Sequence, residues 1–109
     1  MNELTAAIQR AKNGFKDLQK ITDNTWDTLI DGSKEGTEEF ASGLSDVKNS
    51  MAKMFNVDAK RITDQFVKNH IKDMKAMAKG TEEEAMKAQD AIEDDLLAEV
   101  MKLEGLDNV

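Results

Sequence analysis

The chain contains no cysteine, no proline and no tyrosine among its 109 residues. Without cysteine it has no disulfide, no thiolate metal site and no cysteine nucleophile, and nothing points to an oxidising compartment. Aromatic residues make up only 5% of the chain, and β-branched residues are also sparse, which disfavours a sheet-rich fold. Leu, Met, Ala, Lys and Glu are common instead, so the composition predicts an all-helical protein.

Long apolar runs are missing as well. No run approaches the roughly 20 residues that span a bilayer, and the segment Met1–Arg10 lacks the apolar core of a secretory signal. We therefore expect no membrane partner and synthesis in the cytoplasm.

A basic surface is also missing, because the net charge is −7. Residues 80–109 hold ten acidic and two basic residues, whereas residues 1–79 hold twelve acidic and thirteen basic ones. An acidic C-terminal face repels phosphate backbones, and no cluster of Lys and Arg interleaved with aromatics stands elsewhere. The sequence therefore disfavours nucleic acid as a partner.

Apolar residues recur at helical spacing near the N-terminus. They predict a helix that starts at Asn2 or Glu3 and whose apolar stripe needs a partner surface. The weak helix formers at 22–25 predict either a bend or a capped restart near Asp23. The stripe consists of Leu4, Ile8, Ala11, Phe15 and Leu18.

Turn and capping residues divide the middle of the chain. Gly32 and Gly36 bracket a predicted turn, after which Thr37 opens a short helix that ends near Gly43. Ser45 is predicted to cap a further helix.

The second half of the chain reads as two more helical segments. Residues 56–58 form a predicted turn in which Asp58 caps the segment that follows, and Gly80 ends that segment. Thr81–Glu84 is a predicted capping box that opens the last helix. The first segment's predicted buried face is Ile62, Phe66, Ile71, Met74 and Met77. The last helix is predicted to end near Gly105 and to bury Ala85, Ala88, Ile92, Leu96, Val100 and Leu103.

These elements predict an all-α fold. We expect a compact bundle of four to five amphipathic helices, with an array of helical hairpins as the alternative. Residues 1–109 form one predicted domain without an internal linker, which we expect to be a fragment of a longer chain.

Catalytic constellations are weak. His70 is the only histidine, and a nucleophilic triad or a zinc site needs further His or Cys residues. Its position near Phe66 and Met74 predicts a structural or surface role. Gly-rich phosphate loops are absent from the sequence, so we expect no enzyme and no cofactor.

Carboxylate pairs at helical spacing occur at Asp90/Asp94 and at Asp95/Glu99. Such pairs act as acid and base when burial separates their pKa values, but polar neighbours favour a solvent-facing stripe here. The segment Asp27–Glu38 imitates a calcium loop yet has Leu29 in place of an oxygen ligand. We therefore expect no metal site.

The seven methionines allow two interpretations. Most fall on predicted apolar faces, where Met fills a core, whereas a cluster of exposed Met side chains forms a groove that adapts to a partner. The predicted protein contacts are the acidic C-terminal face and any large apolar side chain left exposed. These candidates are Trp26, Glu83, Met86, Asp90, Asp94, Asp95 and Met101.

From Gly43 onward the order of features resembles a segment of tail tape measure proteins from long-tailed phages and from prophages of low-GC Gram-positive bacteria. The resemblance covers about half of the chain and contains no catalytic motif. It implies a long, mostly helical parent around which tail tube subunits polymerise. The residues that carry it are Leu44–Val47, Met54–Asp58, Ile62–Asn69 and Ala76–Ala85, followed by an acidic helix.

Two hypotheses follow. The first is a virion structural or assembly domain that contacts tail tube subunits or a tail chaperone, is made in the host cytoplasm and ends in the phage tail. The second is a stand-alone helical adaptor or regulator that binds a partner through a Met-lined groove. Self-association is compatible with both.

Overall fold

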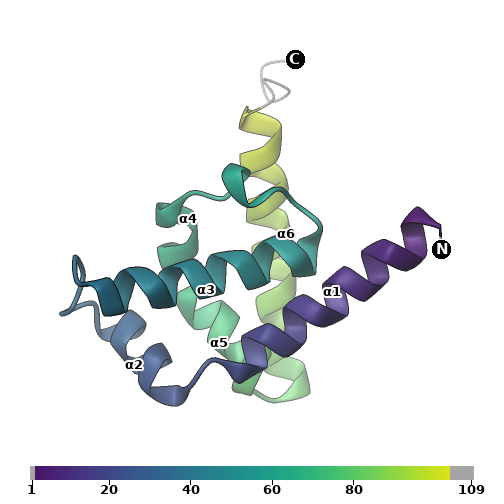
Figure 1. The fold of residues 1–109 in the computed structure, drawn as a ribbon. Coiled ribbons are helices and arrows are strands. Elements are labelled where there is room, and N and C mark those ends of the chain that lie inside the picture. Colours follow the sequence, from purple (N-terminus) through teal and green to yellow (C-terminus); the bar gives the residue numbers. More distant parts are fainter. Residues whose placement is uncertain (1, 104–109) are drawn as a thin grey trace.

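The computed structural model describes residues 2–103, apart from the side chains of residues 100 and 103. Over this range the chain is all-α and contains no strand. Helix α3 crosses the middle of the molecule and is contacted by α1, α2 and α4, whereas α6 packs on α5 (Figure 1). The elements are α1 (Glu3–Lys20), α2 (Asp23–Asp31), α3 (Glu38–Phe55), the 3₁₀ turn η1 (Ala59–Arg61), α4 (Asp64–Asn69), α5 (Ile71–Lys79) and α6 (Glu82–Leu103).

The first two helices are separated by a capped restart, which decides between the two predicted alternatives. The Thr22 hydroxyl accepts a hydrogen bond from the Thr25 N–H at 3.2 Å, which satisfies one of the free donors at the start of α2. The following turn is confirmed, because Gly32 and Gly36 both have positive φ, a conformation that favours glycine.

The predicted break between Gly43 and Ser45 is wrong, because α3 runs through both residues. A Cβ on Gly43 would lie only 3.0 Å from Thr25 Cγ2 and 3.4 Å from Leu29 Cδ2. The glycine therefore allows α2 to pack closely on α3 and does not end a helix. Ser45 is exposed within α3, whereas Thr37 caps the helix as predicted.

The segment after α3 is more broken than its pattern predicts. Asn56 ends α3 in the left-handed conformation at φ 55°, and the Asp58 carboxylate accepts from the Lys60 N–H at 3.0 Å. Asp58 is thus confirmed as a cap, but only of η1. Thr63 then caps α4, and the backbone at His70 separates α4 from α5. The predicted buried face is nevertheless confirmed at Ile62, Phe66, Ile71, Met74 and Met77.

The last helix opens with the predicted capping interaction. The Thr81 hydroxyl accepts from the Glu84 N–H at 3.2 Å and donates to the Glu84 carboxylate at 3.1 Å. Three of the predicted inward residues are buried and Ala85 is half-buried. The predictions for the side chains of residues 100 and 103 and for Gly105 lie outside what the structure describes. The buried three are Ala88, Ile92 and Leu96.

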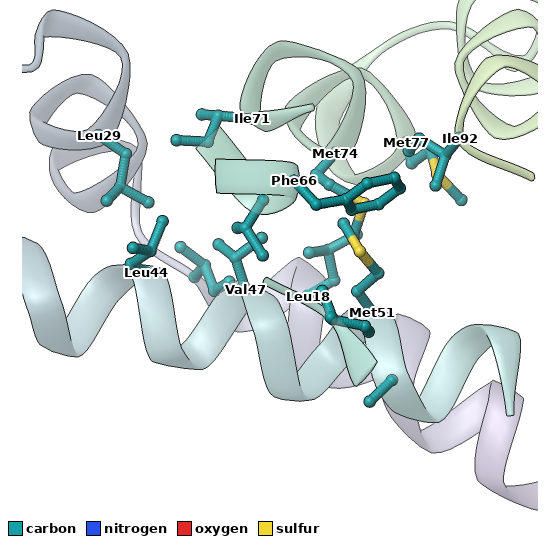
Figure 2. Packing of buried hydrophobic residues seen from close by; sticks show 14 of the residues in the cluster. Leu18, Leu29, Leu44, Val47, Met51, Phe66, Ile71, Met74, Met77 and Ile92 are labelled. Atoms are coloured by element: carbon teal, nitrogen blue, oxygen red, sulfur yellow. The ribbon is translucent and has the colours of Figure 1, made fainter. Parts of the chain in front are cut away.

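One hydrophobic cluster joins α1 through α6. Helix α1 packs mainly on α3, and α6 packs mainly on α5, so α3 and α5 form the middle of the bundle. None of the helices in the described range is long and apolar enough to cross a membrane. Figure 2 shows the α3 side chains Leu44, Val47 and Met51 facing Phe66, Ile71 and Met74. The predicted compact all-α bundle is therefore confirmed, but the described range contains six α-helices where four to five were predicted.

Candidate functional site

A partly apolar groove lies between α1 and α6. Its floor comes from the C-terminal end of α3 and the end of α5, and its volume is about 340 Å³. The groove exists because α1 leans on α3 and α6 leans on α5, so the two outer helices make few contacts with each other. We call it the α1–α6 groove. Its lining residues are Ala11, Phe15, Met54, Phe55, Met77, Glu82, Ala85, Met86, Gln89 and Glu93.

A second hollow continues the groove along α6. It measures about 430 Å³ and shares Met54, Phe55 and Glu93 with the first. Val57 and Leu97 complete its walls together with Leu96. The two hollows therefore form one mostly apolar channel that follows α6 over several helical turns.

Apolar side chains remain in solvent on both helices that flank the groove. On α1, Leu4 is 70% exposed and Ile8 is 49% exposed, and both precede the residues that line the groove. On α6, Met86 is 61% exposed and Leu97 is 62% exposed. The apolar stripe predicted for α1 is thus fully buried only near the C-terminal end of the helix, at Leu18.

The two helices that flank the groove carry opposite charges. Glu82 and Glu93 line the groove on the α6 side, and Asp90 lies on the same helix. Lys12 and Lys16 are exposed on α1. Within residues 2–103, none of these five side chains forms an ion pair, so their charges are available to a partner.

The predicted contact residues on α6 are accessible. Asp90 and Asp94 are exposed, as is Met101 at 36%. Glu83 is exposed and pairs with Lys87 at 3.5 Å. The predicted solvent-facing carboxylate stripe is therefore present on α6.

Trp26 must be removed from the candidate contacts. It is fully buried between the helices, because α2 turns its ring toward the core and not outward. Its Nε1 finds no hydrogen-bond partner among the described residues. Burial of the large apolar indole ring therefore outweighs the cost of leaving its N–H group without a partner.

Asp95 has a role that its sequence pattern does not indicate. Its carboxylate lies 2.9 Å from His70 Nε2, and the Asp73 carboxylate lies 2.8 Å from His70 Nδ1. The imidazole is 8% exposed and packs against Phe66 with a ring distance of 4.7 Å. His70 therefore links the junction of α4 and α5 to α6, which supports the structural interpretation of this residue.

The imidazole geometry also bears on chemistry. Both ring nitrogens face a carboxylate of this protein, Asp73 at Nδ1 and Asp95 at Nε2. The carboxylates around His70 thus hold two elements together and do not form an open acid–base pair.

The calcium-like segment does not fold as a loop. Asp27 and Asp31 lie in α2 and Glu38 lies in α3. The Asp27 carboxylate lies 4.0 Å from Lys75 Nζ. In the described part of the chain, no three His, Cys, Asp or Glu side chains gather closely enough to hold a metal ion.

A polar hollow between α1 and α3 contains one perturbed group. The Asp17 carboxylate of α1 accepts a hydrogen bond from Lys53 Nζ of α3 at 2.7 Å. This hydrogen bond, supported by the lysine's positive charge, lowers the pKa of Asp17. The pair ties α1 to α3 beside their closest approach.

Sequence reasoning missed the groove's floor. Met54 and Phe55 sit at the helical spacing that indicates a core, and Val57 belongs to the predicted turn, yet all three are half-buried at this surface. The sequence did carry one signal of an open surface, the apolar residues Leu4 and Ile8 at the start of the first predicted helix. No other predicted element was clearly available to bury them.

Comparisons of the chain with protein-family models, curated proteins and solved structures found no match.

Proposed function

We propose that this chain is a non-enzymatic structural or assembly domain that works as part of a phage tail tape measure protein. It acts by helix packing and by contacts with tail tube subunits or a tail chaperone. The α1–α6 groove is the contact surface, and the acidic side of α6 orients the partner.

One observation carries the proposal. The segments that resemble tape measure proteins supply the floor and one end of the groove, through Met54, Phe55, Val57, Met77 and Ala85. The resemblance and the open apolar surface therefore coincide in space. Exposed apolar surfaces of this kind mark sites of protein contact.

The direct test is an in-frame deletion of this segment in the phage or prophage that encodes it. A ruler segment shortens the tail by its own length when it is removed. The loss would be about 160 Å if all 109 residues are extended as helix at about 1.5 Å per residue. It would be close to 39 Å if the segment keeps its compact shape along the tail. Intact tails of unchanged length would overturn the proposal.

A single substitution can distinguish the role of the groove in tail assembly from the role of the segment in setting tail length. Met86→Lys places a charge in the groove without touching the core, because Met86 is 61% exposed. We expect it to reduce tail assembly without changing the length of the tails that form. Ile30→Lys, on an exposed position of α2 outside the groove, serves as the control.

The second candidate function is a stand-alone adaptor that binds its partner through a Met-lined groove. Met54, Met77 and Met86 all line the groove, and Met side chains repack around varied partners. A partner unrelated to tails, captured by the wild-type chain and lost with Met86→Lys, would favour this function. Binding to purified tail tube subunit or tail chaperone would favour the first.

A further inference from the structure

We infer that the α1–α6 groove receives helix α1 of a second copy of this chain, in a two-fold pair in which each copy fills the other's groove. The inference does not depend on the proposed role in tails, where the tail tube subunit or chaperone would displace the second copy from the groove. It concerns an apolar surface and an apolar helix face that the same chain leaves uncovered.

The first argument is that the groove is an uncovered apolar channel and that α1 has an exposed apolar edge. The groove is an apolar channel beside α6, with Met86 and Leu97 exposed along it. The N-terminal half of α1 extends beyond the rest of the bundle (Figure 1) and exposes Leu4 and Ile8. Residues four apart lie on one face of a helix, so α1 presents a narrow apolar edge of the kind that enters a groove.

The second argument is charge. Helix α1 carries four basic and two acidic residues, whereas the described α6 carries eight acidic and two basic residues. Lys12 and Lys16 on α1 and Glu82, Asp90 and Glu93 on α6 have no ion-pair partner within residues 2–103. An α1 helix from a second copy brings unpaired lysines to unpaired carboxylates.

The third argument is symmetry. Each copy carries one projecting α1 and one open groove, so a two-fold axis satisfies both contacts at once and closes the assembly. An unrelated basic helix would fill the groove but would leave the Leu4 and Ile8 edge in solvent. The second copy covers both surfaces.

The test is the oligomeric state of the full chain, measured by sedimentation velocity at protein concentrations up to about 1 mM, the weak end of specific association. We expect a concentration-dependent dimer. Ile8→Glu brings an acid toward the acidic α6, and Met86→Lys brings a base toward the basic α1. Each change alters a side chain that is about half exposed or more, so the fold remains, and each should weaken the dimer at least about tenfold.

A mixture of the two variants gives the specific readout. In a mixed pair one contact is unchanged from the wild type. The other contact brings the two substituted side chains together, the acid introduced by Ile8→Glu and the base introduced by Met86→Lys. The mixture should therefore dimerise more tightly than either variant alone. Ile30→Glu, at an exposed apolar position of α2, is the matched control and should leave the dimer unchanged.

Three results would overturn the inference. The wild-type chain is monomeric over the whole concentration range, which assigns the groove to another protein. The dimer forms but tolerates both Ile8→Glu and Met86→Lys, which places its interface elsewhere. The mixture dimerises no better than the separate variants, which means that α1 and the groove do not meet.

Discussion

A single glycine sets the distance between the two most extensively packed helices. At Gly14 a Cβ would lie 2.7 Å from Lys53 Cβ and 2.8 Å from both Met54 N and Ser50 O. Two of these contacts are backbone atoms, which cannot rotate away. Helix α1 therefore needs a residue without a side chain where it crosses α3.

This close contact predicts whether Gly14→Ala stabilises or destabilises the protein. Gly→Ala stabilises an ordinary helix by about 0.5–1 kcal/mol, but we expect Gly14→Ala to destabilise this protein by about 1–3 kcal/mol because it overpacks the crossing. Urea unfolding followed by circular dichroism measures the change. Asn13→Ala, on the exposed neighbouring position, is the control and should stay within about 0.5 kcal/mol. A Gly14→Ala protein more stable than the wild type would refute the close crossing.

The Asp17–Lys53 pair predicts a pH dependence. The hydrogen bond from Lys53 lowers the pKa of Asp17 in the folded state. A lowered carboxyl pKa stabilises the fold above the unfolded-state value of about 3.9 and loses that contribution as pH falls through the folded-state value. The wild type should therefore exceed Asp17→Asn in stability near neutral pH. The difference should shrink as pH falls below about 3.9 and vanish below the folded-state pKa of Asp17.

The same difference should shrink when the lysine is removed. In a Lys53→Met background, the pH dependence of the Asp17→Asn effect should become much weaker, because only the charge of Lys20 then still lowers the pKa of Asp17. Thermal unfolding of the four proteins from about pH 2 to about pH 7, which brackets the carboxyl titration, provides the data. A pH dependence of unchanged size without Lys53 would mean that the hydrogen bond from Lys53 is not the main cause of the shift.

Helix ends were predictable where a side-chain cap fixes them. Thr37, Asp58 and Thr81 all accept the backbone hydrogen bonds that their sequence context predicts, because capping depends on residues only two or three positions apart. The break expected at Gly43 was wrong because a glycine has two uses. It ends helices, and it also permits close helix packing, and only the position of α2 decides between them.

Helix α3 supplies the matched test of this distinction. Thr37→Ala should cost about 1 kcal/mol because it removes the N-cap of α3. Ser45→Ala should be neutral or slightly stabilising, because Ser45 is an exposed interior position where Ala is the better helix former. Chemical denaturation of both variants compares them. A loss of similar size at Ser45 would indicate that a helix does begin there.

The junction of α4 and α5 was beyond sequence prediction. Residues 62–77 show one continuous apolar pattern, so nothing local announces that the chain turns at His70. The turn is held by tertiary contacts, since the imidazole meets carboxylates from both α5 and α6. The candidate site could not be predicted for the same reason, since it depends on tertiary structure. Met54 and Phe55 have the spacing of core residues, and their exposure depends on the distance between α1 and α6.

At the scale of the molecule, apolar side chains are buried on one side of the bundle and exposed to solvent on the other. The core between α3 and α5 is closed, with Met51 and Met74 fully buried. Between α1 and α6 the same kind of apolar side chain faces solvent, including Met86. Monomeric proteins rarely keep such a surface without a partner. The central claim is therefore that the α1–α6 groove is an unfilled contact surface on an otherwise packed domain.

The most direct measurement is the methyl NMR spectrum of ¹³C-labelled methionines with a soluble paramagnetic agent, recorded on a dilute sample and on a concentrated one. In the dilute sample we predict strong broadening at Met86, intermediate broadening at Met54 and protection at Met51, Met74 and Met77. At high concentration, Met86 and Met54 should become protected as the groove is filled. Protection of Met86 in the dilute monomer, or equal broadening of all five methyl groups, would contradict the account.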